Sequence, residues 1–260
     1  MISVLSATEH DYYCMPLPFV VYSWHKLNIG SIVFIPNEQN AKMELAKKYC
    51  FGKVQFHTFR CADFKIPTYS QVVRLFGAAI PELNENEILI TGDGDMAVFN
   101  NDYFNQFNNE NINVIGHDLT PSEQYPMCYC SMPVYKWRNV FNINKSYQEH
   151  LEEIIDPIQS TNLRGDAWCL DQFLLKKQLN NSGFHIIIHP RSNGQNQFAT
   201  RRADRDGWHF SALDIVDAHL PRPLTDDENF NKVYNLFSEI YPNDDLTWMK
   251  EYQKQYKELL

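Results

Sequence analysis

The 260-residue sequence lacks the features that mark several classes of protein. Its six cysteines include no CxxC pair and no regular spacing, which argues against a disulfide framework or a zinc site and indicates a reducing compartment. Basic residues number 23 against 32 acidic ones, and the net charge of −9 argues against a protein that coats nucleic acid phosphates. What is present, 44% hydrophobic and 14% aromatic residues, is enough to bury the core of a globular protein.

Long hydrophobic runs are also missing. The longest uncharged stretch, from Tyr12 to His25, is shorter than a membrane span and contains two prolines. The N-terminus has no basic region followed by a long apolar stretch, so we expect neither a signal peptide nor a membrane span. The sequence therefore predicts a cytoplasmic protein.

Apolar runs typical of strands alternate with helical patterns along the first half of the chain. Strands are expected at Ile2–Ser6, Ser31–Ile35, Val54–Phe59 and Glu87–Thr91, and helices at Leu17–Leu27, Ala41–Tyr49 and Tyr69–Ile80. This order implies βαβ units, and so an α/β fold with a mainly parallel central sheet flanked by helices. Ligands of such sheets bind beyond the carboxyl ends of the strands, near a switch in strand order.

The second half of the chain is less regular. Strands are expected at Met127–Tyr135 and Phe184–His189, and helices at Trp137–Asn142, Tyr147–Ile155, Asp166–Leu179 and within Asp226–Leu260. Arg191–Trp208 is a polar, charge-dense loop that is long enough to act as a functional lid.

The most informative segment is Ile88–Phe99, in which a buried strand delivers two aspartates. Asp93 and Asp95 are two residues apart, so their carboxylates project on one side of an extended chain, and Gly92 and Gly94 let the backbone approach a ligand closely. Paired carboxylate oxygens suit Mg²⁺ or Mn²⁺, which then binds phosphate oxygens. The alternative is a solvated Asp-Gly turn at the end of a strand.

This segment resembles the GT-A glycosyltransferases, nucleotide-sugar enzymes with a Rossmann-like sheet and a metal-binding DxD motif. Asp93-Gly94-Asp95 matches the DxD between two hydrophobic segments. The resemblance implies that Arg74, in the helix ahead of the motif, faces the nucleotide. It also implies that the loop after the first strand, with Thr8 and Glu9, holds the base and ribose.

Two downstream segments are similar to further family features. Asp166 stands at an expected helix start, where inverting members carry the base that activates the acceptor, and Asp171 is the second candidate for this role. Asp166 is equally consistent with a helix N-cap. His219, in a loop bounded by prolines, resembles the C-terminal histidine that completes the metal site, although a lone histidine is commonly structural.

The loop Arg191–Trp208 carries Arg201, Arg202 and Arg205 among aspartates. One interpretation is a surface network of salt bridges, which contributes little to stability. The other is a lid whose guanidinium groups neutralise a departing diphosphate.

Together these features predict one GT-A-like domain over residues 1–260, with a nucleotide-sugar-binding half at 1–115 and an acceptor-binding half at 116–260. The expected activity is transfer of a sugar from a nucleotide-sugar, UDP being favoured, to a hydroxyl of a glycan acceptor. The expected metal is Mn²⁺ or Mg²⁺, held by Asp93, Asp95 and His219, and the reaction is expected to be inverting. The alternatives are a sugar-nucleotide nucleotidyltransferase, which needs a glycine-rich basic loop after the first strand, and a non-catalytic binding module of the same fold.

Overall fold

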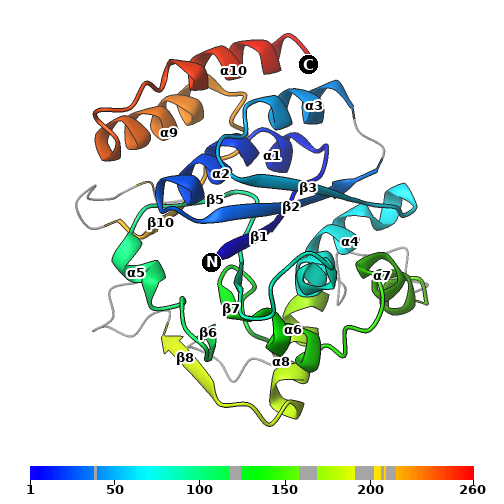
Figure 1. Cartoon of the computed structure of the whole chain (residues 1–260). Coiled ribbons are helices and arrows are strands. Elements are labelled where there is room, and N and C mark those ends of the chain that lie inside the picture. Colours follow the sequence, from blue (N-terminus) through cyan, green and yellow to red (C-terminus); the bar gives the residue numbers. More distant parts are fainter. Residues whose placement is uncertain (38–39, 117–123, 158–168, 191–201, 206–207, 209–214) are drawn as a thin grey trace.

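The computed structural model describes residues 1–37, 40–116, 124–157, 169–190, 202–205, 208 and 215–260 (Figure 1). Within these ranges the strands are β1 (Ile2–Ser6), β2 (Gly30–Pro36), β3 (Val54–Phe59), β4 (Ile88–Thr91), β5 (Met96–Val98), β6 (Ile112–Gly116), β7 (Cys130–Pro133), β8 (Ile186–Pro190), β9 (Arg202–Ala203) and β10 (Asp217–His219). The helices are α1 (Asp11–Cys14), α2 (Leu17–Lys26), α3 (Ala41–Lys48), α4 (Ile66–Val72), α5 (Asn101–Asn105), α6 (Val134–Val140), α7 (Tyr147–Ile155), α8 (Leu170–Asn181), α9 (Asp227–Ile240) and α10 (Thr247–Lys257), with 3₁₀ segments η1 (Asp63–Lys65) and η2 (Val73–Ala79).

The described strands form a seven-stranded sheet in the order β3-β2-β1-β4-β7-β6-β8 and a three-stranded sheet in the order β5-β10-β9. Strands β1 to β4 are parallel, as are β6 and β8, whereas β7 runs antiparallel to both β4 and β6. The predicted α/β fold with a mainly parallel sheet is confirmed. The chain builds β2 and β3 on one side of β1 and returns to β4 on the other, so the order switches between β1 and β4.

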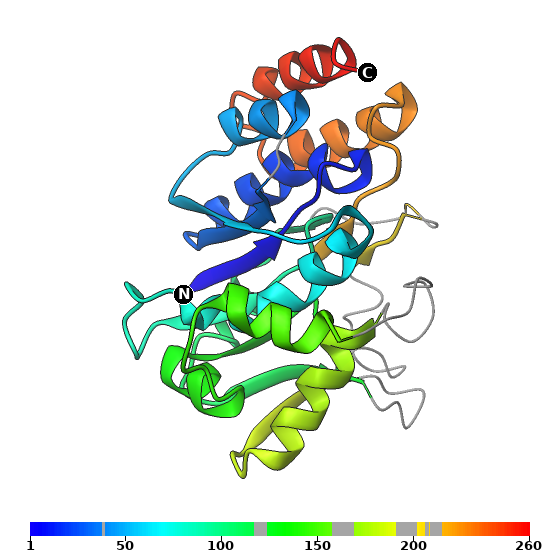
Figure 2. The same ribbon diagram turned by 90° about the vertical axis from the view of Figure 1, so that its right-hand side faces the viewer.

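Helices cover both faces of the large sheet, and each layer encloses its own core. Helices α1, α2, α3, α9 and α10 lie on one face, and α4, α6, α7 and α8 lie on the other (Figures 1 and 2). Because neighbouring side chains of a strand point to opposite faces, Leu5 and Ile90 join the first core while Val4 and Leu89 join the second. The two layers hold β1 and β4 rigidly between them.

Several elements differ from the sequence-based expectations. The helix expected at Tyr69–Ile80 is α4 followed by the 3₁₀ segment η2, which is non-helical at Phe76. Helix α8 begins at Leu170 after the N-cap residue Cys169, later than the expected start at Asp166, which lies outside the described residues. The short strands β5 and β6 were not expected, because three and five residues give too little periodicity to identify a strand.

Helix α7 forms where the sequence predicts it, because its first turn is capped. The Ser146 side chain accepts a hydrogen bond from the Glu149 backbone, and the Glu149 carboxylate accepts one from the Ser146 backbone.

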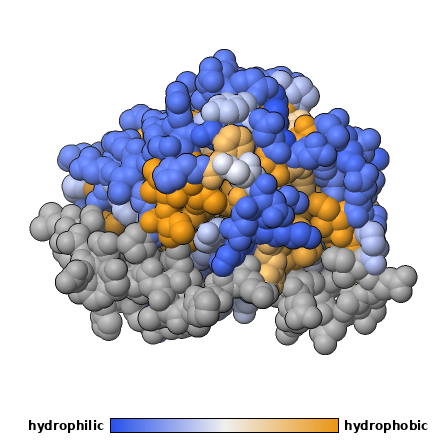
Figure 3. All heavy atoms as spheres, turned by 90° about the horizontal axis from the view of Figure 1, so that it is seen from below, coloured by the Kyte–Doolittle hydropathy of each residue, from blue (hydrophilic) through white to orange (hydrophobic). Residues whose placement is uncertain are grey.

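The surface seen from below carries an apolar area among charged residues (Figure 3). Strand β8 lies on that side of the molecule, and its Ile188 is 53% exposed. Among the described residues, no helix is both long enough and apolar enough to cross a bilayer.

Buried His150 of α7 predicts that stability falls in mild acid. Burial holds the pKa of His150 below its ordinary value, and Lys145 acts in the same direction. The unfolded chain therefore binds a proton near pH 6.5 that the folded chain does not. The free energy of unfolding is accordingly highest above that pH and decreases as the pH is lowered through it.

His150→Phe keeps a ring stacked on Phe76, which lies 4.8 Å from the imidazole centroid, and removes the titrating group. We expect urea unfolding to show a smaller loss of stability in this variant than in the wild type between about pH 7.5 and 5.5. Parallel losses in both proteins would assign the acid sensitivity to other groups.

Candidate functional site

The DxD segment lies against the end of β1 because both of its glycines lack a side chain. A Cβ on Gly94 would stand 2.5 Å from the backbone oxygen of Ser6, and one on Gly92 would stand 2.7 Å from Leu5 Cδ2. The backbone of Gly92 also donates a hydrogen bond to Val4, at 3.0 Å. Glycine therefore allows the motif to sit at the strand-order switch, where α/β sheets bind ligands.

The second sheet brings the C-terminal part of the chain to the motif. Strand β10 pairs antiparallel with β5, with His219 opposite Met96, and Leu220 donates a backbone hydrogen bond to Asp95 at 2.9 Å. His219 was expected in a loop, but it ends a strand. Sequence-distant Asp95 and His219 are thus held together by backbone pairing rather than by side chains alone.

One oxygen of Asp95 is the centre of the site. Asp95 is buried, and its Oδ2 lies 3.0 Å from His219 Nε2 and 2.9 Å from Arg205 Nη2, and it also accepts from Arg222 Nη2. The predicted residues Asp95, His219 and Arg205 therefore meet. Two guanidinium groups share this one carboxylate, and a second acid, Asp204, has an oxygen 3.6 Å from His219 Nδ1.

The hydrogen bonds of His219 define its protonation. Arginine only donates, so Nδ1 of His219 accepts from Arg205 Nε at 3.2 Å, and Nε2 carries the proton that faces Asp95. Burial lowers the pKa of His219, although the Asp95 charge opposes this shift. The imidazole is accordingly neutral at pH 7.

Arg222 belongs to the site but was not selected from the sequence. Its guanidinium lies over the rings of Tyr13 and Tyr12, at 4.6 and 5.4 Å from the centroids, and these contacts brace it. Its Nε is buried with no hydrogen-bond partner among the described residues. The sequence feature that could have indicated this arginine is its position between two prolines just after His219.

Asp93 faces a different partner from Asp95. Arg74 binds Asp93 Oδ1 at 2.5 Å and Asp171 Oδ2 at 2.8 Å, and donates to the Gly92 carbonyl at 2.9 Å. Burial would raise the pKa of Asp93, but Arg74 holds it below its ordinary value. Burial raises the pKa of Asp171 despite the same arginine. This triad, in which Arg74 and Asp171 are buried and Asp93 is half-buried, joins the motif to η2 and α8.

Arg202 lies in the protein interior and not in the cluster around Asp95. Its guanidinium makes a two-point contact with Asp217 at 2.7 and 2.6 Å, and both side chains are buried. Tyr129 donates to the same carboxylate at 2.8 Å. The expected surface salt bridge is thus an interior one that fixes β9 on β10.

The loop after β1 presents unpaired acceptors. Thr8 is buried and accepts from the His10 backbone at 3.3 Å. Glu9 Oε2, Ser70 Oγ and Gln71 Oε1 are buried with no hydrogen-bond partner among the described residues. A short bond of 2.5 Å from Ser6 Oγ to the Ser70 carbonyl joins β1 to α4. Buried acceptors of this kind suit the hydroxyl and N–H groups of a ligand.

Two predicted residues, Asp166 and Arg201, lie outside the described residues. Asp171 lies within them, where its Oδ1 accepts from the Gln172 backbone at 2.9 Å while Oδ2 is held by Arg74.

The donor types at the site fit a hard divalent cation. Asp95 and His219 already place a carboxylate oxygen and an imidazole nitrogen 3.0 Å apart, and oxygen and imidazole ligands suit Mn²⁺. Asp93 is directed to Arg74 instead, and the described part of the chain contains no ready-made group of three or more acidic, histidine or cysteine side chains for a metal. Metal binding at Asp95 requires the arginines to release its Oδ2.

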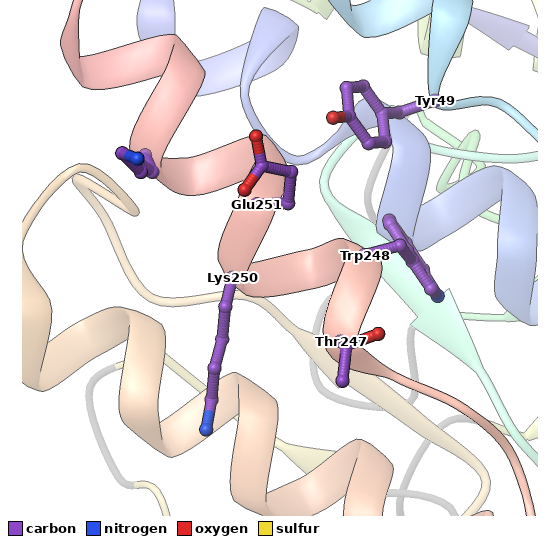
Figure 4. Close-up of a pocket in the computed structure, with 6 residues that line it drawn as sticks. Tyr49, Thr247, Trp248, Lys250 and Glu251 are labelled. Atoms are coloured by element: carbon purple, nitrogen blue, oxygen red, sulfur yellow. The ribbon is translucent and has the colours of Figure 1, made fainter.

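A separate hollow of about 560 Å³ is lined by Tyr49, Thr247, Trp248, Lys250, Glu251 and Lys254 (Figure 4). It shares no residue with the cluster around Asp95. The Trp248 ring stacks on Phe19 and on Tyr49, with centroids 5.6 and 6.5 Å away. Trp248 therefore serves mainly to pack α10 on the core.

No protein-family model matches the sequence, and no curated protein matches it either. Among solved structures, the chain is similar to galactosyltransferase LgtC in complex with donor and acceptor sugar analogues, with 12% identity over 92% of this chain and 96% of that one, and a TM-score of 0.49. It is also similar to 4-diphosphocytidyl-2C-methyl-D-erythritol synthase from Anaerococcus prevotii, with 9% identity over 73% of this chain and 86% of that one, and a TM-score of 0.42. Both likenesses are distant, so the function is inferred below from the site residues.

Gly94→Ala tests the close approach of the motif to β1. The added methyl group would meet a backbone oxygen, so we expect a loss of about 1–3 kcal/mol in the free energy of unfolding, measured in urea. Gly77→Ala is the matched control, because its Cβ would meet only the side chain of Val4, at 3.0 Å. An equal or smaller loss at Gly94 would show that the contact with Ser6 is not tight.

Proposed function

We propose that this protein is a metal-dependent glycosyltransferase that moves a sugar from a nucleotide-sugar, with UDP as the favoured nucleotide, to a hydroxyl of a glycan acceptor. The observation that carries the proposal is the cluster of Asp95, His219, Arg205 and Arg222 at the strand-order switch. It joins candidate metal ligands to two guanidinium groups, which is the combination that a diphosphate needs.

The loop after β1 supports the same proposal. The unpaired acceptors of Glu9, Ser70 and Gln71 follow β1 or lie in α4, and polar groups of a base or ribose are suitable donors for them. The diphosphate would then extend toward Arg205 and Arg222. This is the order of groups in a nucleotide-sugar, with the sugar last.

In the proposed reaction the acceptor oxygen forms a bond to the anomeric carbon while the bond from that carbon to the diphosphate oxygen breaks. The leaving diphosphate keeps the electron pair, and Arg205 and Arg222 are placed to neutralise its charge. A bound Mn²⁺ or Mg²⁺ would be held by Asp95 and His219, with Asp93 alongside, and would supply Lewis-acid stabilisation of the same oxygens. Asp166 stays the predicted base that takes the acceptor proton.

The triad of Arg74, Asp93 and Asp171 supports a positioning role for Asp171 rather than that of the base. Both of its oxygens are engaged, and Arg74 ties it to Asp93. Its role would be to fix the start of α8 relative to the motif.

A nucleotidyltransferase is the second candidate. Against it, the loop Ser6–Asp11 contains no glycine, lysine or arginine with which to hold a triphosphate. Release of pyrophosphate from a nucleoside triphosphate and a sugar phosphate would favour this second activity.

Calorimetric titration of UDP and of GDP, with and without Mn²⁺, tests the proposal. We expect one nucleotide to bind at micromolar concentration and Mn²⁺ to strengthen that binding by roughly tenfold or more, which is about 1.4 kcal/mol. In Asp95→Asn the Mn²⁺ effect should disappear, because the carboxylate is lost.

Asp102→Asn, on the exposed start of α5, makes the same charge change away from the site and should retain the Mn²⁺ effect. If neither nucleotide binds with or without metal, Asp93 and Asp95 form an ordinary strand-end turn and the proposal fails.

Asp166→Asn and Asp171→Asn separate the two candidate bases. We expect the first to lower kcat at least a hundredfold while UDP binding stays near normal, because only proton transfer is lost. The second should lower the free energy of unfolding by about 3 kcal/mol, since it takes one buried partner from Arg74. Steady-state kinetics and urea unfolding distinguish these effects. Normal stability with a similar loss of kcat in Asp171→Asn would instead make Asp171 the base.

A further inference from the structure

Arg205 forms hydrogen bonds with both of the side chains that the proposed metal site would need. Its Nη2 donates to Asp95 Oδ2 at 2.9 Å, and its Nε donates to Nδ1 of His219 at 3.2 Å. A single guanidinium thus bridges the carboxylate of the DxD segment and the imidazole at the end of β10.

This bridge opposes metal binding in two ways. It places a positive charge on the carboxylate oxygen that a cation would take. It also fixes the imidazole tautomer, because a hydrogen bond to Nδ1 leaves the proton on Nε2, the nitrogen that faces Asp95. A metal ligand needs a bare nitrogen, so His219 cannot bind through Nε2 while Arg205 holds Nδ1.

The same arginine is poorly satisfied where it stands. Arg222 contacts the same oxygen of Asp95, so two like charges share one carboxylate. The other nearby acid, Asp204, is half exposed, with its oxygen 3.6 Å from His219 Nδ1. A diphosphate offers several negative oxygens and would draw Arg205 away from Asp95.

We propose that Arg205 makes metal binding conditional on the donor diphosphate. Without donor, Arg205 occupies Asp95 and His219 and keeps the affinity for metal low. When a diphosphate binds, Arg205 and Arg222 both pair with it, and the carboxylate and imidazole that they leave take the metal. This inference rests on the proposed function and adds a positive coupling between metal and donor.

Mn²⁺ titrations followed by electron paramagnetic resonance, with and without UDP, measure this coupling. We expect wild-type protein to bind Mn²⁺ weakly alone and at least tenfold more tightly with UDP. In Arg205→Ala, Mn²⁺ should bind roughly five- to tenfold more tightly without UDP, and the gain on adding UDP should shrink. Arg205→Lys should fall between them, because an ammonium can neutralise Asp95 but does not have the fork that also holds His219.

Two controls isolate the bridge from a general charge effect. Lys177→Ala, at an exposed position of α8, removes one positive charge elsewhere and should leave both Mn²⁺ affinities unchanged. Nitrogen NMR of the metal-free wild type should show the His219 proton on Nε2, and circular dichroism checks that each variant is folded.

The outcomes separate this inference from the proposed function. If Mn²⁺ binding requires UDP and is lost in Asp95→Asn, but neither arginine variant alters it, the role of Arg205 is overturned while the proposed function stands. If wild-type protein binds no Mn²⁺ with or without UDP, both are overturned. Tighter metal binding and weaker coupling in Arg205→Ala establish the role.

Discussion

The close contact between the ends of β1 and β4 is the constraint on which the site depends. Only glycine fits at position 94, where the chain passes the Ser6 carbonyl, and this passage delivers Asp95 to the point where the strand order switches. Helices on both faces hold the two strands, so the motif inherits the rigidity of the sheet. A carboxylate on such a scaffold is placed before any ligand arrives, and that lowers the cost of binding.

The small sheet connects the C-terminal part of the chain to the rigid strands of the large sheet. After the motif, β5 pairs with β10, and the buried Arg202–Asp217 pair fixes β9 beside it. These pairings bring His219 and Arg205 to Asp95, while Arg74 joins Asp93 to α8 on the other side. The two aspartates of one motif therefore organise two different regions of the protein, and Asp95 is the one that contacts Arg205 and Arg222.

The sequence predicts the parallel strands, the helices between them and the importance of Asp93, Asp95 and His219, because periodicity and the DxD segment are local signals. It does not predict the β5–β10 pairing or the Arg74 triad, because these depend on contacts between residues far apart along the chain. Arg222 was missed for the same reason, and nothing local distinguishes the buried Arg202 from Arg205. The start of α8 was placed too early, since an aspartate before a helical pattern resembles an N-cap whether or not it forms one.

Two arginines of this acidic protein gather at one carboxylate of the site. The chain carries a net charge of −9, which repels anions at long range, yet Arg205 and Arg222 converge on one buried carboxylate. In the proposed site, an anion must enter and displace Asp95 from its arginines. A diphosphate meets this requirement better than a single phosphate, because it can pair with both guanidinium groups at once. In the proposed mechanism, Asp95 would first pair with the arginines in place of the anion and would then bind the cation that accompanies it.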